Sequence, residues 1–459
     1  MPFRLEANLA QNFIQLDEQH FGAFHWRTTL TTGLGVFCDG YDLSSVGIVL
    51  PLILHSYGNA SLTSLQSASL AASALLGAAI GALAFGALAQ KGRKRFYGFD
   101  VLILGLAALS QAFAPNLAWL ISLRFILGLG VGADYVLSPT IMAEHSNRAD
   151  RGRALGLGFG TMWPLGALAA AFFTLLLQGF GVPDDLLWRI VLAAGAVPAF
   201  SVLYFRRRMP ETARYLARVA GDRDESARVI AEISGQAATA PARDERRFGL
   251  VFALHSRAIL SAALLWMVYD LVVYASILFG PSLIANSLGL RPLTFTILSE
   301  VLFVLPASVL FSVFLIDQVG RKPLQVWGFA CGAVLVGVFA LMQSRLLAVP
   351  ILAFAVYGLF NVAQTGPGLV SGAGILGVEL APTRIRSVAQ GITVAGGRIG
   401  AAVSAFLFPL LFKGIGPAGA YWIIAGLALL GAILTQLLVP ETGRIALERI
   451  TETRLPEGG

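Results

Sequence analysis

Long runs of apolar residues, each about 20 residues in length and separated by short polar breaks, fill most of this 459-residue chain. A helix of about 20 apolar residues can cross the ~30 Å hydrocarbon core of a bilayer. Only 13% of the residues are charged, whereas a soluble domain has roughly 25%. Because lipid offers the backbone no hydrogen-bond partners, the spanning segments must be helices. The sequence therefore predicts an all-α membrane protein.

We predict twelve transmembrane helices from the positions of these runs. The first six occupy residues 28–55, 66–90, 97–114, 117–142, 153–179 and 188–206. The last six occupy residues 258–285, 293–316, 323–342, 349–377, 386–412 and 418–438. The predicted organisation is an N-terminal segment (1–27), a six-helix half (28–206), a central loop (207–257), a second six-helix half (258–440) and a tail (441–459).

The distribution of basic residues predicts the orientation of the chain. Only Arg189, Arg291, Arg345 and Lys413 fall in the odd-numbered connections, whereas most of the others fall in the even-numbered connections and the two ends. Lys and Arg accumulate in cytoplasmic loops, so we expect both termini to be cytoplasmic in a multi-pass protein of the plasma membrane. The net charge of +7 then reflects topology, and we expect no nucleic-acid partner.

Several ionisable residues lie inside the predicted spans. A charge within a spanning helix costs several kcal/mol, so such residues usually face the bundle interior or a wet cavity. They are Asp39, Asp42, Arg124, Asp134, Asp270, Glu300 and Arg398. A chain that keeps so many charges at membrane depth is expected to move a solute past them.

The chain also contains an internal repeat. Gly-Arg-Lys at 92–94 recurs at 320–322, and Pro-Glu-Thr-x-Arg at 210–214 recurs at 440–444. Glu144 followed by Arg151 recurs as Glu379 followed by Arg386. Three matches in the same order predict two six-helix repeats, a common plan of secondary transporters whose substrate site lies between the halves. The alternative is a duplicated membrane scaffold that transports nothing.

These motifs resemble those of the major facilitator superfamily, and the resemblance covers nearly the whole chain. Asp317 followed by Gly320-Arg321-Lys322 is similar to the superfamily's loop signature, whereas the first half has Ala89 at the position of the Asp. Arg124 with the glycines after it resembles a pattern of proton-coupled members, and Pro-Glu-Thr-x-Arg resembles the sugar-transporter-like branch. The resemblance implies a cytoplasmic gate formed by Gly92, Arg93, Glu144, Arg151, Asp317, Gly320, Arg321, Glu379 and Arg386.

Within that branch the chain most resembles the phosphate:proton symporters. The matching segments are Asp39-Gly40-Tyr41-Asp42, Gly132-Ala133-Asp134-Tyr135, Trp266-x-x-x-Asp270-x-x-x-Tyr274 and Gly397-Arg398-Ile399-Gly400, with arginine in place of the family's lysine. The resemblance implies that Tyr135, Trp266, Asp270, Tyr274 and Arg398 contact the substrate. It also implies that Asp39, Asp42 and Asp134, with Arg124, couple transport to protons.

Two segments depart from the phosphate symporters. The amide that the family carries on helix five is absent from residues 160–164, and its Gly-Pro-Asn-Thr-Thr run on helix ten is Gly-Pro-Gly-Leu-Val at 366–370. Both changes remove hydrogen-bond partners for a polar anion. The first-helix segment 39–51 also resembles aromatic-acid:proton symporters, so organic acids and sugars stay open as alternative substrates.

The residues support an anion site without the resemblance. Trp266, Asp270 and Tyr274 are spaced i, i+4, i+8 and therefore share one helix face. Arg398 lies among small residues, and its planar guanidinium suits phosphate or carboxylate. The alternative for Arg398 is a permanent ion pair with Asp270, and an anion could also exchange with Asp270 as its partner. Arg124 and Asp134 lie about 15 Å apart on a straight helix, so they are not expected to pair.

Other polar residues have two readings each. Asn361 and Gln364 are spaced as substrate partners on helix ten, or they form packing bonds between helices. Glu300 is either a cavity residue or a charge that snorkels near the helix end. Tyr135 either donates to the substrate or packs.

The function predicted from these features is proton-coupled symport of a small polar solute by alternating access, with inorganic phosphate as the expected substrate. No Gly-x-x-x-x-Gly-Lys-Ser/Thr loop occurs, which disfavours an ATP-driven pump. The five histidines are scattered, so we expect neither an enzyme nor a metal site, and no cofactor beyond the coupling proton. We expect the bilayer and a small molecule or ion as partners, a functional monomer, and, as a distant alternative, a non-transporting sensor.

Overall fold

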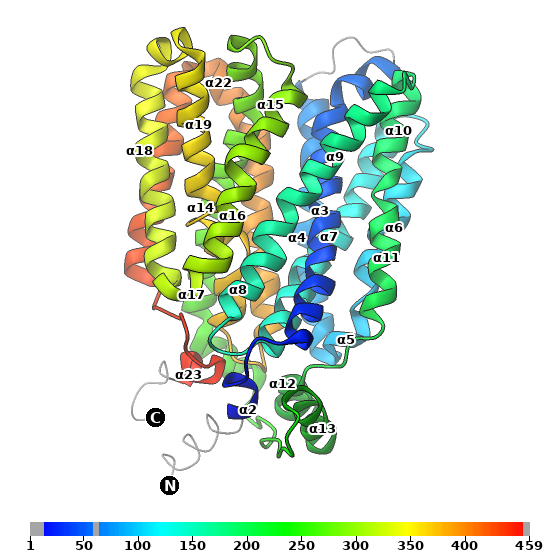
Figure 1. The fold of residues 1–459 in the computed structure, drawn as a ribbon, viewed down its shortest axis with the longest axis vertical. Coiled ribbons are helices and arrows are strands. Elements are labelled where there is room, and N and C mark those ends of the chain that lie inside the picture. Colours follow the sequence, from blue (N-terminus) through cyan, green and yellow to red (C-terminus); the bar gives the residue numbers. More distant parts are fainter. Residues whose placement is uncertain (1–12, 58–63, 453–459) are drawn as a thin grey trace.

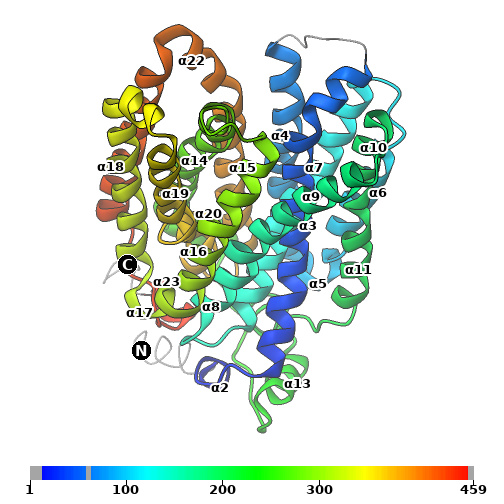
Figure 2. The same ribbon diagram turned by 45° about the horizontal axis from the view of Figure 1, so that its top comes forward.

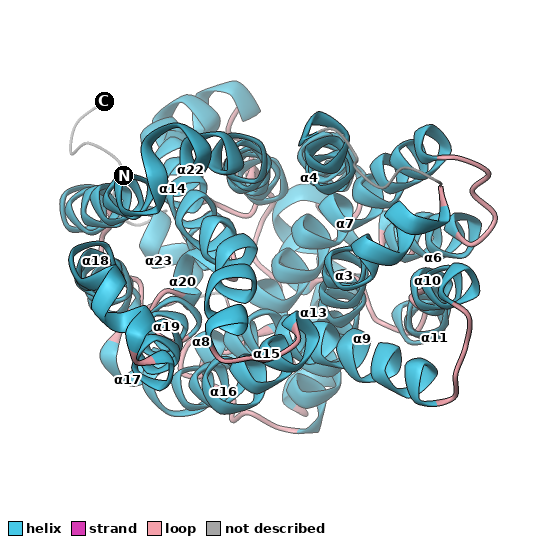
Figure 3. Cartoon of the chain, turned by 90° about the horizontal axis from the view of Figure 1, so that it is seen from above, coloured by secondary structure: helices cyan, strands magenta, loops and turns pink. Residues whose placement is uncertain are grey.

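The computed structural model describes residues 13–57 and 64–452, and every regular element in these ranges is helical. The helices form two bundles that stand side by side, one from each half of the chain (Figure 1). The view along the long axis shows the two groups of helices meeting at the middle of the molecule (Figure 3). The predicted all-α fold of two six-helix halves is thus confirmed.

The first half contains six spans. The first four are α3 (Ala23–Ser56), α4 (Ser64–Leu88), α6 (Phe99–Gln111) and α7 (Leu117–His145). The fifth consists of α8 (Arg151–Leu155), η2 (Gly156–Thr161) and α9 (Met162–Gly179). The sixth consists of α10 (Asp184–Ala194) and α11 (Ala196–Arg206). The short η1 (Ala89–Lys91) and α5 (Arg93–Phe96) join α4 to α6. These positions agree with the predicted spans to within a few residues.

The second half begins with α14 (Phe248–Ser287), which is the seventh span. The eighth span is made up of α15 (Pro292–Ser299), η4 (Glu300–Val304), α16 (Leu305–Leu310), η5 (Phe311–Leu315) and α17 (Ile316–Val319). The half continues with α18 (Arg321–Ala348), α19 (Pro350–Thr365), α20 (Leu369–Gly372), α21 (Ile375–Glu379) and α22 (Arg386–Leu438). The 53-residue α22 holds the last two spans, because Gly416 breaks the helix at φ 75° and ψ 170°.

Two spans differ from the prediction. The seventh helix begins at Phe248 rather than at residue 258, because the helix extends N-terminally beyond the predicted span. The tenth span, predicted to be one helix over 349–377, is broken into α19, α20 and α21. Gly366 and Gly374 occupy non-helical backbone conformations there. The sixth span ends at Arg206, as predicted, and this residue is fully buried.

Small residues allow the central helices to approach closely. A side chain at Gly132 of α7 would overlap the carbonyl oxygen of Ala78 on α4. A Cβ at Gly391 of α22 would lie 2.6 Å from the carbonyl oxygen of Ala82, also on α4. Helix α4 therefore packs tightly against its own half on one side and against the other half on the opposite side.

Short helices gather at one end of the bundle, which we call the basal end (Figure 2). They are α2 (Ile14–Asp17), α12 (Ala213–Tyr215), η3 (Leu216–Ala220), α13 (Arg223–Ser234) and α23 (Leu447–Glu452). Arg214 donates to Asp17 at 2.6 Å and to Glu448 at 2.9 Å. One buried arginine thus ties α2, the central segment and α23 together.

Candidate functional site

A cavity with about 120 Å³ of water-accessible space lies where the two halves meet. This volume is well above the ~10–15 Å³ that a single water needs. All seven predicted substrate-contact residues line it: Tyr135, Trp266, Asp270, Tyr274, Asn361, Gln364 and Arg398. The structure brings them together from α7, α14, α19 and α22, and their role in binding stays a prediction.

Arg398 lies at the centre of this cavity wall and has only incomplete partners. Its Nη1 donates to the Tyr274 hydroxyl at 3.1 Å, and its guanidinium lies 4.2 Å from the centre of the Tyr135 ring. The Asp270 carboxylate is 3.6 Å away, too far for a good hydrogen bond. Within the described residues, neither Arg398 Nε nor Asp270 Oδ2 has a hydrogen-bond partner. The pair is therefore loose, and the guanidinium keeps donors for an anion.

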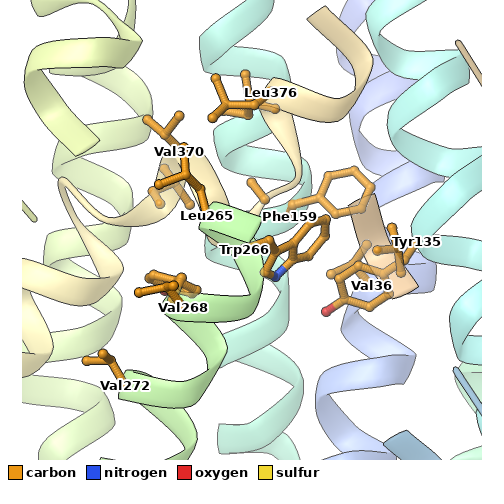
Figure 4. Close-up of a cluster of buried hydrophobic side chains, with 14 of the residues drawn as sticks. Val36, Tyr135, Phe159, Leu265, Trp266, Val268, Val272, Val370 and Leu376 are labelled. Atoms are coloured by element: carbon orange, nitrogen blue, oxygen red, sulfur yellow. The ribbon is translucent and has the colours of Figure 1, made fainter. Parts of the chain in front are cut away.

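The sequence around Arg398 explains why it can reach this position. A Cβ at Gly397 would lie 2.6 Å from the Trp266 ring, and one at Gly400 would overlap the carbonyl oxygen of Met267. The two glycines let α22 lie directly against α14. The Trp266 ring packs 6.1 Å from the Tyr135 ring, and Figure 4 shows Phe159 beside them. The aromatic surface of α14 thus continues onto Tyr135 of α7 and Phe159 of the fifth span.

Three polar residues with open readings also lie at the cavity. Glu300 lines it from η4, and its Oε2 has no hydrogen-bond partner among the described residues. Asn361 donates to the carbonyl of Tyr357 at 3.1 Å, and Gln364 donates to the carbonyl of Gly328 at 3.2 Å. The Gln364 amide therefore forms a packing bond between helices, as one interpretation predicted, whereas the Asn361 amide bonds within α19 and Glu300 faces the cavity rather than the helix end.

Sequence reasoning missed other residues of the wall. Tyr269 lines the cavity and donates to the carbonyl of Gln364 at 3.0 Å, and Phe159, Trp163 and Phe360 contribute apolar surface. Tyr269 is three residues after Trp266, so it falls on the same helix face. Including residues three positions after Trp266 in the predicted helix face would have identified Tyr269.

The two segments that differ from the phosphate symporters, residues 160–164 and 366–370, pack against each other. A side chain at Gly160 of η2 would overlap the side chain of Leu369 on α20. Both residues line the cavity. This part of the wall is apolar, so a bound anion would find its polar partners on α7, α14 and α22.

Asp134 has a partner that the sequence did not suggest. Its Oδ1 accepts from Arg206 Nη2 at 2.7 Å and from Ser138, and the Arg206 Nη1 donates to Asp100. The side chains of Arg206, Asp100 and Asp134 are all fully buried. A side chain at Gly35 would overlap both Arg206 and Asp134, so this glycine lets the triad lie against α3. The sequence offered no signal for Arg206 beyond its place at the end of an apolar run.

Asp39 lies close enough to both this triad and Arg398 of the substrate cavity for their charges to act on it. Neither of its carboxylate oxygens has a hydrogen-bond partner in the described part of the chain, and the side chain is fully buried. The charged groups that act on it are Asp134, Arg398 and Arg206, together with Asp42. An unpaired charge in such a place is expensive, so Asp39 is suited to exist as the neutral acid.

Asp42 and Arg124 form a separate contact on α3 and α7. Arg124 Nη1 donates to the backbone carbonyl of Asp42 at 3.3 Å, and the Oδ2 of Asp42 has no hydrogen-bond partner in the described residues. Arg124 thus lies near Asp42, and Asp134 is held by Arg206 instead. The expectation that Arg124 and Asp134 do not pair within one helix agrees with this geometry.

Two buried glutamates connect the halves at the basal end. Glu379 accepts from Arg151 of the first half at 2.7 Å, from Arg321 of its own half at 3.1 Å and from Thr442 at 2.5 Å. Three partners, two of them cations, satisfy one fully buried carboxylate. Because one of the two arginines crosses the interface, this contact holds the two halves together.

Glu144, the first-half counterpart of Glu379, makes the equivalent contact with an arginine of the second half. Glu144 accepts from Arg386 of the second half at 2.9 Å, from Arg93 of its own half at 3.4 Å, and from Thr212. We call the Glu144 and Glu379 clusters the two clamps. The threonines belong to the Pro-Glu-Thr-x-Arg motifs, so the repeated motifs meet in space as well as in sequence.

The loop signature explains a further contact between the halves. Asp317 accepts from the backbone amides of Gly152 at 3.0 Å and Arg153 at 2.6 Å, and from Arg321 at 2.7 Å. It therefore caps a helix of the opposite half. In the first half, where Ala89 replaces the Asp, Gln90 donates to Ser387 at 2.7 Å instead. The first half thus forms a neutral hydrogen bond at the position where Asp317 of the second half caps a helix with its charged carboxylate.

Glycines at both signatures have backbone conformations that other residues rarely adopt. Gly92 has φ 134° and Gly320 has φ 99°. Glu441 accepts from the amides of Arg321 and Lys322 at 2.9 and 3.1 Å, directly after Gly320. The turn and its glutamate cap therefore explain why Gly-Arg-Lys and Pro-Glu-Thr recur together.

We predict that Glu379→Gln opens the basal end. Removing one partner of a buried ion pair costs about 3–5 kcal/mol, so the ratio of open to closed molecules should rise more than about 100-fold. Spin labels on cysteines at the exposed Lys91 and Gln318 should report longer distances by electron spin resonance. Glu18→Gln is the control, because its exposed pair with Arg148 does not connect the halves. Unchanged distances in Glu379→Gln would contradict a role in closure.

This architecture defines a class of protein. Two pseudo-symmetric six-helix halves enclose a polar cavity, and paired clamps close one end of it, which is the arrangement of a secondary transporter. The family model described as "Sugar (and other) transporter" matches residues 28–453. The chain therefore belongs to the Sugar (and other) transporter family, within the major facilitator superfamily, as its motifs predicted.

Plant phosphate transporters are among the relatives of this chain. The chain is 32% identical to Probable inorganic phosphate transporter 1-6 of Arabidopsis thaliana, covering 95% of each protein. It is 30% identical to Inorganic phosphate transporter 1-6 of Oryza sativa subsp. japonica, covering 93% of this chain and 92% of the relative.

Solved structures with the same fold include those of the xylose transporter XylE from E. coli. The proton:xylose symporter XylE bound to 6-bromo-6-deoxy-D-glucose superposes with a TM-score of 0.79 at 21% identity, over 94% of this chain and 99% of XylE. The inward-open conformation of XylE from E. coli gives a TM-score of 0.65 at 22% identity, over 93% of this chain and 99% of XylE.

Proposed function

We propose that this transporter is a proton-coupled symporter of inorganic phosphate that works by alternating access. The observation that carries the proposal is the incompletely paired Arg398 guanidinium, which shares the cavity with the hydroxyl of Tyr274 and the ring of Tyr135. Arg forms strong, directional bonds to phosphate oxygens. The names of relatives that match nearly the full length support the same substrate.

In the proposed mechanism, phosphate displaces Asp270 as the partner of Arg398. Protonation of Asp39 and of the Asp134 region offsets the negative charge that the anion brings to the cavity. The halves can then rock about the tightly packed α4–α22 contact, and the clamps break as the basal end opens. We place the basal end in the cytoplasm of a plasma-membrane protein, because the central basic segment lies there. The functional unit is a monomer, and its only cofactor is the coupling proton.

The proposal is tested by counterflow in proteoliposomes. Vesicles preloaded with unlabelled phosphate, with an aromatic acid or with a hexose are diluted into the corresponding labelled solute. Saturable exchange of phosphate supports the proposal. Saturable exchange of the hexose alone would overturn the anion reading, since a neutral sugar needs no guanidinium.

A small carboxylic acid is the second candidate substrate. Gly160 and Leu369 make part of the wall apolar, where the phosphate symporters carry polar groups, and Phe159 and Phe360 add aromatic surface. A carboxylate could bind Arg398 while its apolar body packs on this wall. Exchange of the aromatic acid with higher affinity than phosphate would favour this candidate.

Asp134→Asn is predicted to uncouple transport from the proton gradient. An amide cannot bind and release the proton, so uphill uptake driven by pH should fall to the equilibrium level while counterflow continues. Uptake under an imposed pH gradient measures the loss. Asp100→Asn is the matched control, because it neutralises the other carboxylate on Arg206 and should keep accumulation. Full accumulation by Asp134→Asn would exclude its role as the coupling site.

A further inference from the structure

A second cavity lies at the basal end, on the outer side of the first half. It has about 230 Å³ of water-accessible space between α5, α6 and α11. Gly98 shapes its floor: its φ is 126°, and a Cβ there would lie 3.0 Å from the Leu203 side chain. Tyr97 and Phe99 form the adjoining wall. This cavity shares no lining residue with the substrate cavity, although Arg206, the ion-pair partner of Asp134, borders it.

The lining of this second cavity is strongly basic. Lys94, Arg95 and Arg207 line it, and all three are exposed. Within the described ranges, none of the three forms an ion pair with a carboxylate, and no Asp or Glu lines the cavity. The fourth cation, Arg206, is already held by Asp100 and Asp134. Three uncompensated charges therefore surround a space that is open to an anion.

The surroundings of the cavity favour a ligand that is partly apolar. Phe99 is 55% exposed on α6, and Tyr204 and Phe205 are 54% and 46% exposed on α11. These rings lie on spans that must face lipid, next to the basic residues. Aromatic residues at this depth mark the boundary between headgroups and acyl chains. A ligand that satisfies both the cations and the rings needs an anionic head and an apolar body.

The internal repeat shows that this cluster is not a requirement of the fold. The first-half residues Lys94, Arg95 and Arg207 correspond to Lys322, Pro323 and Leu437 of the second half. Lys94 thus belongs to the repeated Gly-Arg-Lys motif, whereas Arg95 and Arg207 have no basic counterpart. The extra charges therefore need an explanation other than the shared architecture.

We propose that this cavity binds the headgroup of an anionic phospholipid. Lys94, Arg95 and Arg207 hold the phosphate, and the acyl chains lie along the exposed faces of α6 and α11. Basic pockets between helices at the cytoplasmic side of a membrane protein are suited to such headgroups. A soluble phosphate would use the cations but would leave the aromatic rim without a partner.

Native mass spectrometry of the full chain in neutral detergent tests the proposal, with phosphatidylglycerol as the probe and phosphatidylcholine as the reference lipid. Each basic side chain near a headgroup contributes about a fivefold gain in affinity, so Arg95→Gln with Arg207→Gln should weaken phosphatidylglycerol binding about 30-fold. Arg95→Gln alone should weaken it about fivefold. The control is Arg228→Gln with Arg247→Gln, which removes two exposed cations of the basal end that do not line the cavity.

The same titration contains the outcomes that would overturn the proposal. Equal binding of phosphatidylglycerol by the wild type and by the Arg95/Arg207 variant would show that the cavity is not the lipid site. Equal loss in the Arg228/Arg247 control would show only a general charge effect. Inorganic phosphate or glycerol phosphate that displaces phosphatidylglycerol at equal concentration would assign the cavity to a soluble anion instead.

Discussion

Arg398→Ala is expected to raise the apparent KM for phosphate in counterflow at least about 30-fold. Truncating one partner of a buried, hydrogen-bonded charge pair costs about 2–5 kcal/mol, and each 1.4 kcal/mol is a factor of ten. The affinity for phosphate falls for two reasons. The anion loses the guanidinium that binds it, and it meets the Asp270 carboxylate without a neutralising cation. Initial rates of labelled phosphate exchange over a wide concentration range measure the effect.

Two further variants separate binding from charge. Arg398→Lys keeps the cation but loses the planar fork, so it should lie between the wild type and the alanine variant. It also restores the residue of the phosphate symporters that the chain resembles. Lys413→Ala removes an exposed cation outside the cavity and should leave KM unchanged. An alanine variant at 398 whose KM stays within about threefold of the wild-type value would show that the arginine does not bind the anion.

Much of the substrate cavity could be predicted from the sequence, for a physical reason. A charge or a stripe of polar residues cannot face lipid, so Asp270 and Arg398 had to point inward. The spacing of Trp266, Asp270 and Tyr274 then fixed which face of α14 turns inward with them. Their convergence in one cavity follows from these two constraints once the halves are placed together.

The contacts between the halves could be predicted only as a list of residues. The repeat singled out Glu144, Arg151, Glu379 and Arg386, but it did not show that each glutamate would accept from an arginine of the opposite half. Sequence symmetry pairs equivalent positions. The crossing of partners depends on how two rigid halves meet, which no local pattern records.

Arg206 marks the limit of reading topology from composition. It is the first of three consecutive arginines after an apolar run, and such runs of charge usually lie outside the membrane. The structure separates them: Arg206 turns inward to Asp100 and Asp134, whereas Arg207 and Arg208 are exposed. One residue of helix rotation, about 100°, moves a side chain from the surface to the interior. The predicted span ends at Arg206, but the sequence does not show that this side chain turns inward.

Arg206→Gln is expected to destabilise the first half by about 3–5 kcal/mol, because it leaves two buried carboxylates with no cation. Thermal unfolding in neutral detergent should show a markedly lower transition temperature. Arg207→Gln is the matched control: its side chain is exposed and forms no ion pair in the described part of the chain, so its change should stay within about 0.5 kcal/mol.

A second set of variants tests whether the loss comes from unpaired charge rather than from packing. Replacing a buried triad of charges by apolar groups is often neutral or stabilising, whereas removing one member is costly. Arg206→Met combined with Asp100→Leu and Asp134→Asn should therefore recover most of the stability that Arg206→Gln loses. The combined variant should still fail to accumulate phosphate, since Asp134 can no longer carry a proton. If Arg206→Gln unfolds at the wild-type temperature, the triad does not hold α6, α7 and α11 together, and Asp134 must be charge-balanced by another group.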